Sequence, residues 1–162
     1  DTDFIGINGT GGGKFRSAQA LADAIEQAWL PAQKAERLVV LTGGEPLLQV
    51  DAALIAALHD KAFTIAAETN GTIKPPEGID WVCVSPKGGK TLAVNSGQEL
   101  KLVYPQPGID PAQYLDLDFE HRYLQPMDGA DSAANTAQAI AYCLAHPQWR
   151  PSVQIHKIVG IR

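Results

Sequence analysis

The sequence predicts an α/β fold with a mostly parallel sheet, either open or curved into an incomplete barrel. Short apolar runs alternate along the chain with segments of helical periodicity, which is the order that a parallel sheet requires. The chain has 162 residues, of which 45% are hydrophobic and 19% are charged. This length fits one domain with a buried core, and the low charge is typical of a compact enzyme domain rather than of a charged binding module.

Helical patterns occupy four segments. The first follows Ser17, a residue type that caps helix N-termini, and its apolar residues recur at four-residue steps as Leu21, Ile25 and Trp29. Pro31 ends this helix. The other three segments are 51–62, a short one at 110–115, and 132–145. The last of these has a predicted buried face formed by Ile140, Ala141 and Leu144.

Six apolar runs predict strands. They are residues 37–42, 63–68, 79–84, 100–104, 122–125 and 153–158. The first run is almost continuously apolar, which predicts a strand that is buried on both faces. Only the Pro-rich segment 72–78 separates the second and third strands, and it is too short for a usual crossover helix. The sequence therefore predicts that some crossovers lack helices.

Polar residues gather where the predicted strands end. The clusters are Thr42–Glu45, Glu68–Gly71, Ser85–Lys87 and Gln125–Asp128, and His156 lies in the last predicted strand. The carboxyl ends of parallel strands meet at one edge of a sheet, so these clusters favour one shared pocket. Glycine, proline and asparagine also punctuate ordinary turns, and any one cluster alone is more often structural.

Composition and cysteine usage exclude several classes of protein. The net charge of −5 argues against non-specific nucleic-acid binding. No run approaches the roughly 20 apolar residues that span a bilayer. The two cysteines, Cys83 and Cys143, are far apart and lie in apolar segments, which predicts inert core residues and excludes a disulfide framework or a four-cysteine zinc site. These observations indicate a reducing, cytoplasmic setting.

Common catalytic and phosphate-binding motifs are missing. The Gly-rich segment 6–14 lacks the P-loop spacing, because Asn8 and Phe15 stand where glycine and serine or threonine are needed. Lys14 stands at the third glycine of a dinucleotide fingerprint, so a surface loop is favoured. The sequence contains no Gly-x-Ser-x-Gly elbow, and no histidine pair has the spacing of a metal site.

The segment Thr42–Leu47 resembles the Gly-Gly-Glu-Pro motif of radical S-adenosylmethionine (SAM) enzymes. Further motifs make the resemblance more specific: Glu68–Gly71, Ser85–Lys87, Glu99–Lys101, Leu124–Asp128 and His156–Lys157. The chain is similar over nearly all of its length to one radical SAM family, the 7-carboxy-7-deazaguanine synthases. Its first residues, Asp1–Phe4, resemble the stretch that directly follows the last cluster cysteine in that family.

The resemblance implies a single modified, partial (β/α) barrel domain over residues 1–162. It implies a lyase that converts 6-carboxy-5,6,7,8-tetrahydropterin to 7-carboxy-7-deazaguanine with release of ammonia, in the biosynthesis of queuosine and other 7-deazapurines. The implied cofactors are SAM, a [4Fe-4S] cluster held by three cysteines, and Mg²⁺. A homodimer and an external electron donor are implied as well, and Trp149 is a candidate for the dimer interface.

The resemblance also assigns site residues. It assigns no catalytic side chain, since the radical comes from the cofactor. The residues matched to SAM binding are Asp1, Gly43, Gly44, Glu45, Glu68, Ser85, Pro86, Lys87, Gln125, Pro126, Met127 and Asp128. Glu45 is expected either to hold its loop or to add negative charge near the methionyl ammonium. Substrate contacts are matched to Thr42, His156 and Arg162, and a magnesium ligand to Thr2.

The chain departs from the family pattern because the cluster cysteines are missing. Three closely grouped thiolates are needed, and Cys83 and Cys143 do not supply them. We therefore expect the ligands to lie just before Asp1, and residues 1–162 alone to be inactive. Two alternatives stay open: an activase that generates a glycyl radical on a partner enzyme, and a cluster-free binding domain that kept only the barrel.

Overall fold

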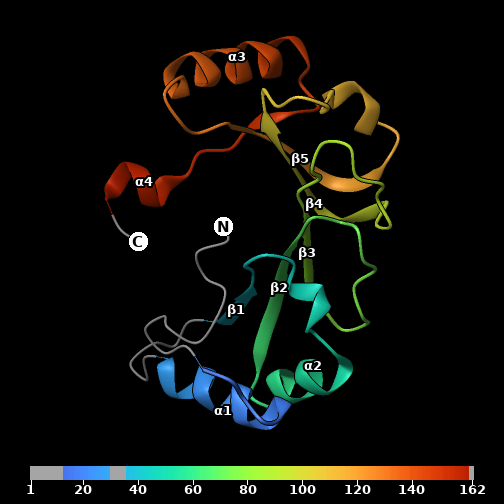
Figure 1. The fold of residues 1–162 in the computed structure, drawn as a ribbon, viewed down its shortest axis with the longest axis vertical. Coiled ribbons are helices and arrows are strands. Elements are labelled where there is room, and N and C mark those ends of the chain that lie inside the picture. Colours follow the sequence, from blue (N-terminus) through green and yellow to red (C-terminus); the bar gives the residue numbers. More distant parts are fainter. Residues whose placement is uncertain (1–12, 30–35, 161–162) are drawn as a thin grey trace. The chain divides into compact units, whose positions relative to one another are not determined.

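The computed structural model describes residues 13–29 and 36–160, and its strands are hydrogen-bonded in sequence order (Figure 1). The helices are α1 (Ala18–Ala28), α2 (Ala52–His59), α3 (Ser132–Ala145) and α4 (Ile155–Val159), with short 3₁₀ turns η1 (Pro46–Leu48) and η2 (Pro111–Tyr114). The strands are β1 (Arg37–Leu41), β2 (Phe63–Thr69), β3 (Trp81–Val84), β4 (Ser96–Tyr104), β5 (Asp118–Pro126) and β6 (Arg150–Pro151). The pairs β1–β2, β3–β4, β4–β5 and β5–β6 are parallel, which confirms the predicted α/β class.

The chain forms two compact units. The N-terminal unit comprises Asp1–Thr69 and Ile73–Val82, and the C-terminal unit comprises Asn70–Thr72 and Cys83–Arg162. No helix in the described ranges is long and apolar enough to cross a membrane.

In the N-terminal unit, α1 and α2 cover one face of the β1–β2 pair. Ser17 caps α1 as predicted, because its hydroxyl accepts a hydrogen bond of 3.2 Å from the Ala20 N–H. The predicted apolar face of α1 is confirmed: Leu21, Ile25 and Trp29 pack against a core that includes the buried Leu58, Phe63 and Ile65. Trp29 meets Phe63 edge to face, with 5.8 Å between ring centroids.

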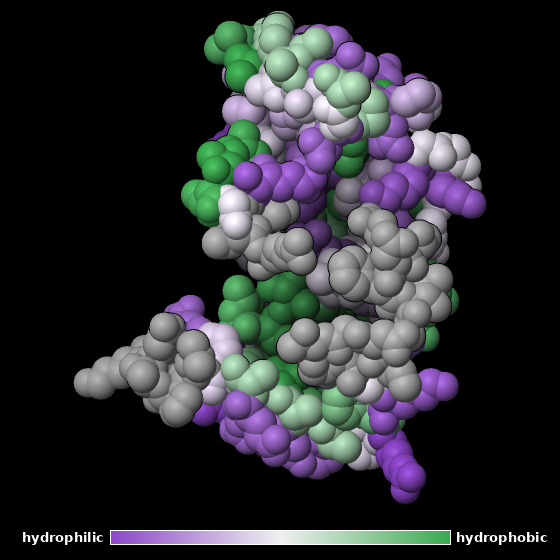
Figure 2. Space-filling view, turned by 60° about the vertical axis from the view of Figure 1, so that its left-hand side comes forward, coloured by the Kyte–Doolittle hydropathy of each residue, from purple (hydrophilic) through white to green (hydrophobic). Residues whose placement is uncertain are grey.

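The prediction that the first strand is buried on both faces is wrong. Val39 and Leu41 pack against the core, whereas Leu38 and Val40 keep 49% and 47% of their surfaces exposed. The physical reason is that both helices pack on the same side of β1 and β2. Figure 2 shows an apolar area in the lower half of the view, on the side where β1 lies in Figure 1.

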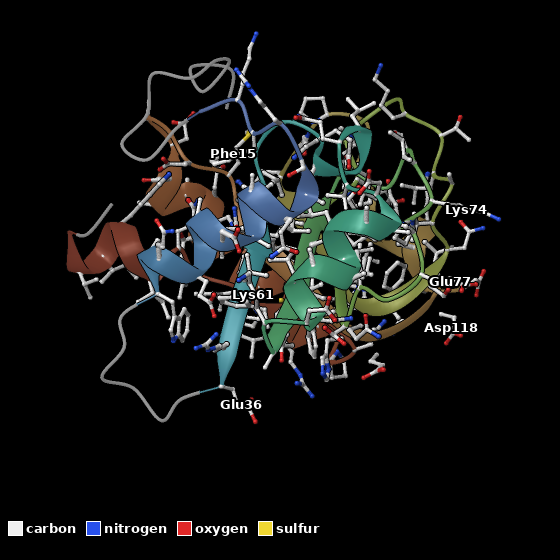
Figure 3. All side chains as sticks on the ribbon, turned by 90° about the horizontal axis from the view of Figure 1, so that it is seen from below. Phe15, Glu36, Lys61, Lys74, Glu77 and Asp118 are labelled. Atoms are coloured by element: carbon white, nitrogen blue, oxygen red, sulfur yellow. The ribbon has the colours of Figure 1, made fainter. Side chains whose placement is uncertain are left out.

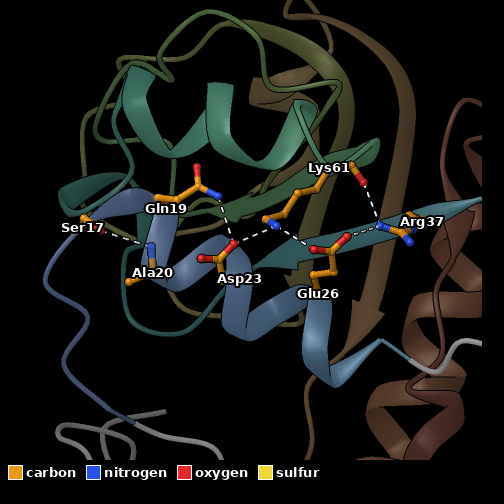
Figure 4. Close-up of polar contacts among 7 residues, drawn as sticks. All are labelled: Ser17, Gln19, Ala20, Asp23, Glu26, Arg37 and Lys61. Atoms are coloured by element: carbon orange, nitrogen blue, oxygen red, sulfur yellow. Dashed lines mark hydrogen bonds and ion pairs between the residues drawn. The ribbon is translucent and has the colours of Figure 1, made fainter.

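An ion-pair network closes the N-terminal unit at the start of its strands (Figure 4). The ammonium of Lys61 lies 2.8 Å from Asp23 Oδ1 and 2.6 Å from Glu26 Oε2, and Arg37 Nη1 lies 2.9 Å from Glu26 Oε1. Arg37 also donates to the Lys61 carbonyl oxygen at 3.0 Å. Lys61 holds the pKa values of Asp23 and Glu26 below their usual range, and both carboxylates raise the pKa of Lys61. The network therefore ties α1 to β1 and to the turn before β2.

In the C-terminal unit, β4 and β5 are paired along their whole lengths, and α3 packs on β5 and β6. The predicted bounds of α3 are confirmed, but its predicted buried face is wrong. Leu144 is 81% exposed and Ile140 is also exposed, while the buried residues are Asn135, Ala139 and Cys143. These three recur at four-residue steps, so they lie on one face of the helix. The expectation that both cysteines are core residues is confirmed.

Two further predictions in the C-terminal unit are wrong. Residues 153–158 were predicted as a strand, yet the strand is only Arg150–Pro151 and the chain then turns into α4. The last sheet hydrogen bond runs from the Ser152 N–H to the Leu124 carbonyl oxygen, one residue beyond Pro151. Pro151 is tolerated because β6 is an edge strand, where the missing N–H costs no hydrogen bond to β5. Trp149 is buried, so it does not lie at an exposed dimer interface.

We predict that Lys61→Met removes a stabilisation that depends on pH. Asp23 and Glu26 have lowered pKa values in the folded state, so their pairing with Lys61 stabilises the fold at neutral pH and is lost as pH falls below about 4. The melting temperature of the variant should lie below that of the wild type at pH 7, and the difference should shrink in acid.

Lys74→Met is the matched control, because Lys74 projects outward at the margin of the same unit (Figure 3). It should leave the melting temperature nearly unchanged at both pH values. Equal melting temperatures of wild type and Lys61→Met at pH 7 would contradict the role given to the network.

Candidate functional site

The loop after β1 presents an accessible backbone. Gly43 has φ +123°, a conformation that side-chain-bearing residues rarely adopt. A Cβ atom added at Gly43 or at Gly44 would meet no atom within 4 Å. The two glycines therefore leave open space beside the backbone, which a ligand can approach.

Glu45 holds this loop in place. Its Oε1 atom accepts a hydrogen bond of 3.1 Å from the Leu47 N–H, which caps η1, and another of 2.8 Å from the Thr69 hydroxyl at the end of β2. Of the two roles expected for Glu45, these two hydrogen bonds support the structural one. They join the loop after β1 to the end of the neighbouring strand.

Glu68 lies on the face of β2 that the helices leave uncovered. Parallel pairing sets Leu38 beside Thr64 and Val40 beside Ala66, and side chains alternate between the two faces of a strand. Glu68 therefore shares a face with the exposed Leu38 and Val40, and it is itself exposed. Thr42, just beyond the end of β1, is exposed as well. The structure thus brings together the Thr42–Glu45 loop and the end of β2 within one unit.

In the C-terminal unit, the segment Gln125–Asp128 is fixed on both sides of Met127. The Met127 N–H donates to the Tyr104 carbonyl oxygen at 2.9 Å, at the end of the neighbouring strand. The Met127 carbonyl accepts from Asn135 Nδ2 on α3, also at 2.9 Å. Asn135 is only 6% exposed, so its amide has been taken out of water to make this contact.

A pocket of about 170 Å³ opens beside this segment. Its lining combines the end of β5, the first turns of α3 and the region of α4: Gln125, Pro126, Met127, Asp128, Ser132, Thr136, Val153, Gln154, Lys157 and Ile158. The Lys157 ammonium lies 2.5 Å from Asp128 Oδ2 and holds the pKa of that carboxyl below its usual range. The contribution of α4 was not predicted, because this segment was expected to be a strand.

The segment Ser85–Lys87 leaves the end of β3 with mixed exposure. Pro86 is fully buried, Ser85 is half-buried and Lys87 is exposed. The turn that follows requires a glycine, because a Cβ on Gly88 would lie 2.5 Å from the Pro107 carbonyl oxygen. The backbone after Lys87 is therefore fixed by close packing within the C-terminal unit.

Several expected site residues lie outside what the structure describes. Asp1, Thr2 and Arg162 are outside the described ranges. His156 lies in α4 rather than in a strand, and its side chain is not among those described.

The cysteines in the described part of the chain do not fit an iron–sulfur cluster. Cys83 is buried in β3 and Cys143 in α3, and burial raises the pKa of the Cys143 thiol, which disfavours the thiolate that binds iron. Within residues 13–29 and 36–160, no group of three or more histidine, cysteine, aspartate or glutamate side chains is arranged to hold a metal ion.

Comparison of the sequence with known proteins finds close relatives among the 7-carboxy-7-deazaguanine synthases. A 7-carboxy-7-deazaguanine synthase from Bradyrhizobium diazoefficiens is 60% identical to this chain over 162 residues, which are 100% of this chain and 77% of that protein. One from Bordetella pertussis is 58% identical over 161 residues, which are 99% of this chain and 76% of that protein. No protein-family model matches the chain.

A solved structure has the same fold. The crystal structure of QueE from Escherichia coli matches with a TM-score of 0.59 and 25% sequence identity. The match covers 85% of this chain and 63% of that chain, so this chain spans less than two thirds of the length of that structure.

We predict that Asn135→Ala destabilises the C-terminal unit by about 1–3 kcal/mol, because it leaves the Met127 carbonyl without its buried donor. Chemical denaturation measures the change in unfolding free energy. Gln138→Ala is the matched control, since it removes an amide from an exposed position of the same helix and should stay within about 0.5 kcal/mol of wild type. Equal losses in the two variants would contradict a specific role for Asn135.

Proposed function

The chain belongs to the 7-carboxy-7-deazaguanine synthase family, and we propose on this basis that the protein is a radical SAM lyase. The proposed reaction converts 6-carboxy-5,6,7,8-tetrahydropterin to 7-carboxy-7-deazaguanine with release of ammonia, a step in the biosynthesis of queuosine and other 7-deazapurines. The observation that carries the proposal is identity of 58–60% to named synthases over 99–100% of the chain.

The SAM-binding residues are proposed from the family resemblance, and the environment of several of those described suits parts of that molecule. The open Gly43–Gly44 backbone offers carbonyl oxygens to the methionyl ammonium, and the exposed carboxylate of Glu68 is an acceptor for ribose hydroxyls. The pocket beside Gln125–Asp128 has the volume for a heterocycle of the size of a purine ring. Ser85–Lys87 and Asp1 complete the proposed set. In this family bound SAM supplies a radical that abstracts a hydrogen atom from the substrate.

The remaining cofactor and substrate assignments are also proposals. Thr42, His156 and Arg162 are proposed to contact the pterin. Thr2 is proposed as a magnesium ligand, since its hydroxyl is a hard oxygen donor. The family implies a [4Fe-4S] cluster, but the buried Cys83 and Cys143 do not fit as its ligands, so we assign it no residue among those described.

The proposal extends to organisation and setting. We propose that residues 1–162 form one partial-barrel domain, and that the protein is a cytoplasmic homodimer served by an external electron donor. These properties follow from the family assignment.

The reaction itself gives the most direct test. The full-length protein, reconstituted anaerobically with iron and sulfide, should convert 6-carboxy-tetrahydropterin to 7-carboxy-7-deazaguanine and ammonia when SAM, Mg²⁺ and a chemical reductant are present. Liquid chromatography with mass detection identifies the product. SAM cleavage to 5′-deoxyadenosine without any deazaguanine would count against the lyase and in favour of an activase.

Two glycine variants separate backbone strain from ligand access. Gly43→Ala places a side chain at φ +123°, so it should cost about 1–3 kcal/mol of stability and also weaken SAM binding. Gly44→Ala introduces a Cβ without a positive φ or a close contact, so it should weaken SAM binding at an unchanged melting temperature. Calorimetry and thermal melts measure the two effects. Unimpaired SAM binding by both variants would remove this loop from the proposed site.

A further inference from the structure

We propose that Thr69 is a positioning residue for SAM binding, acting through Glu45. Its hydroxyl fixes the carboxylate that holds the Gly43–Gly44 loop, and its backbone directly follows Glu68. This inference rests on the proposed function, because it concerns how two recognition elements for one ligand are held at a fixed separation.

The hydroxyl of Thr69 is committed to this contact. Thr69 is 2% exposed, and it is one of two polar residues that are buried in the described part of the chain. A hydroxyl removed from water is costly unless it is hydrogen-bonded, and the Thr69 hydroxyl donates to Glu45 Oε1 at 2.8 Å. A hydrogen bond with a charged acceptor is stronger than one between neutral groups.

Glu45 needs this second anchor because of the residues that precede it. Its Oε1 atom also accepts from the Leu47 N–H, which ties the carboxylate to the turn that follows but not to the sheet. Gly43 and Gly44 have wide conformational freedom, and a Cβ at either position would touch nothing within 4 Å. The contact with Thr69 therefore links Glu45, the residue directly after the Gly43–Gly44 segment, to β2.

The same residue connects the loop to the proposed ribose ligand. Successive side chains in a strand point to opposite faces, so the buried Thr69 and the exposed Glu68 leave β2 on opposite sides. Displacing the Thr69 backbone would move Glu68, and removing its hydroxyl would take away the hydrogen bond that ties Glu45 to the end of β2. Thr69 thus sets the distance between the loop proposed for the methionyl ammonium and the carboxylate proposed for the ribose.

The test measures SAM affinity separately from turnover. Calorimetric titration of the anaerobic full-length holoenzyme with SAM, in the absence of pterin, gives the Kd. Thr69→Val removes the hydroxyl at nearly constant volume and should raise this Kd about tenfold or more. Thr69→Ser keeps the hydroxyl and should restore most of the affinity. In turnover, the KM for SAM should rise while the KM for the pterin stays constant.

A matched control and a double-mutant cycle separate positioning from general damage. Thr64→Val makes the same substitution at an exposed position of the same strand and should change the Kd less than about twofold. In a Glu45→Ala background, Thr69→Val should have little further effect, because its partner is already gone. Thr69→Ala replaces the valine variant in the cycle if the latter does not fold.

Three results would overturn the inference. They are a Kd of folded Thr69→Val within twofold of wild type, an equal loss in Thr64→Val, and a full effect of Thr69→Val in the Glu45→Ala background. A wild-type enzyme that binds SAM and forms product while any of these holds would leave the proposed function intact. A wild-type holoenzyme that does not bind SAM would overturn both.

Discussion

A buried hydroxyl needs a hydrogen-bond partner, and the partner of Thr69 is the carboxylate of Glu45. This contact joins the loop after β1 to the end of β2, the two places in the N-terminal unit where the carboxyl ends of strands carry polar residues. It depends in turn on the core beneath, because parallel pairing and the packing of α1 and α2 fix where β2 ends. The open backbone of Gly43 and Gly44 is followed by Glu45, whose carboxylate is held to β2 by this contact.

In the C-terminal unit, a buried side-chain amide makes the corresponding contact with a loop segment. Asn135 is the other buried polar side chain in the described residues, and it donates to the backbone of Met127 in the segment that lines the pocket. In both units a buried polar group is held by the core and binds the segment proposed to face the ligand. Each such group is costly to bury unpaired, so the loop conformation that satisfies it is favoured over its alternatives.

Local signals made much of the fold predictable. The cap at Ser17 and the four-residue steps of α1 depend only on neighbours in sequence, and the bounds of α3 were predicted without error. The errors mostly concern which face of a helix or strand is buried, because that depends on the elements packed against it. Leu38 and Val40 are exposed because α1 and α2 both pack on the opposite face of β1 and β2. Leu144 is exposed because α3 packs on the strands through Asn135, Ala139 and Cys143 instead. The apolar run 153–158 has the composition of a strand, but its pairing with β5 ends at Ser152 and the helix α4 follows.

The residues of the candidate site likewise fall into those that could be predicted from the sequence and those that could not. Motifs such as Thr42–Leu47 are contiguous, so resemblance alone identified the segments proposed to touch SAM. Thr69 lies inside the Glu68–Gly71 motif, but its role and that of Asn135 were not predicted. A threonine beside a glutamate, or an asparagine in a helix, gives no sign that it will be buried and hydrogen-bonded to a distant loop. Their roles arise from contacts between residues 24 and 8 positions apart in sequence, respectively. Residues that bind a ligand can thus be recognised by pattern, whereas the residues that hold them in place require the packed structure.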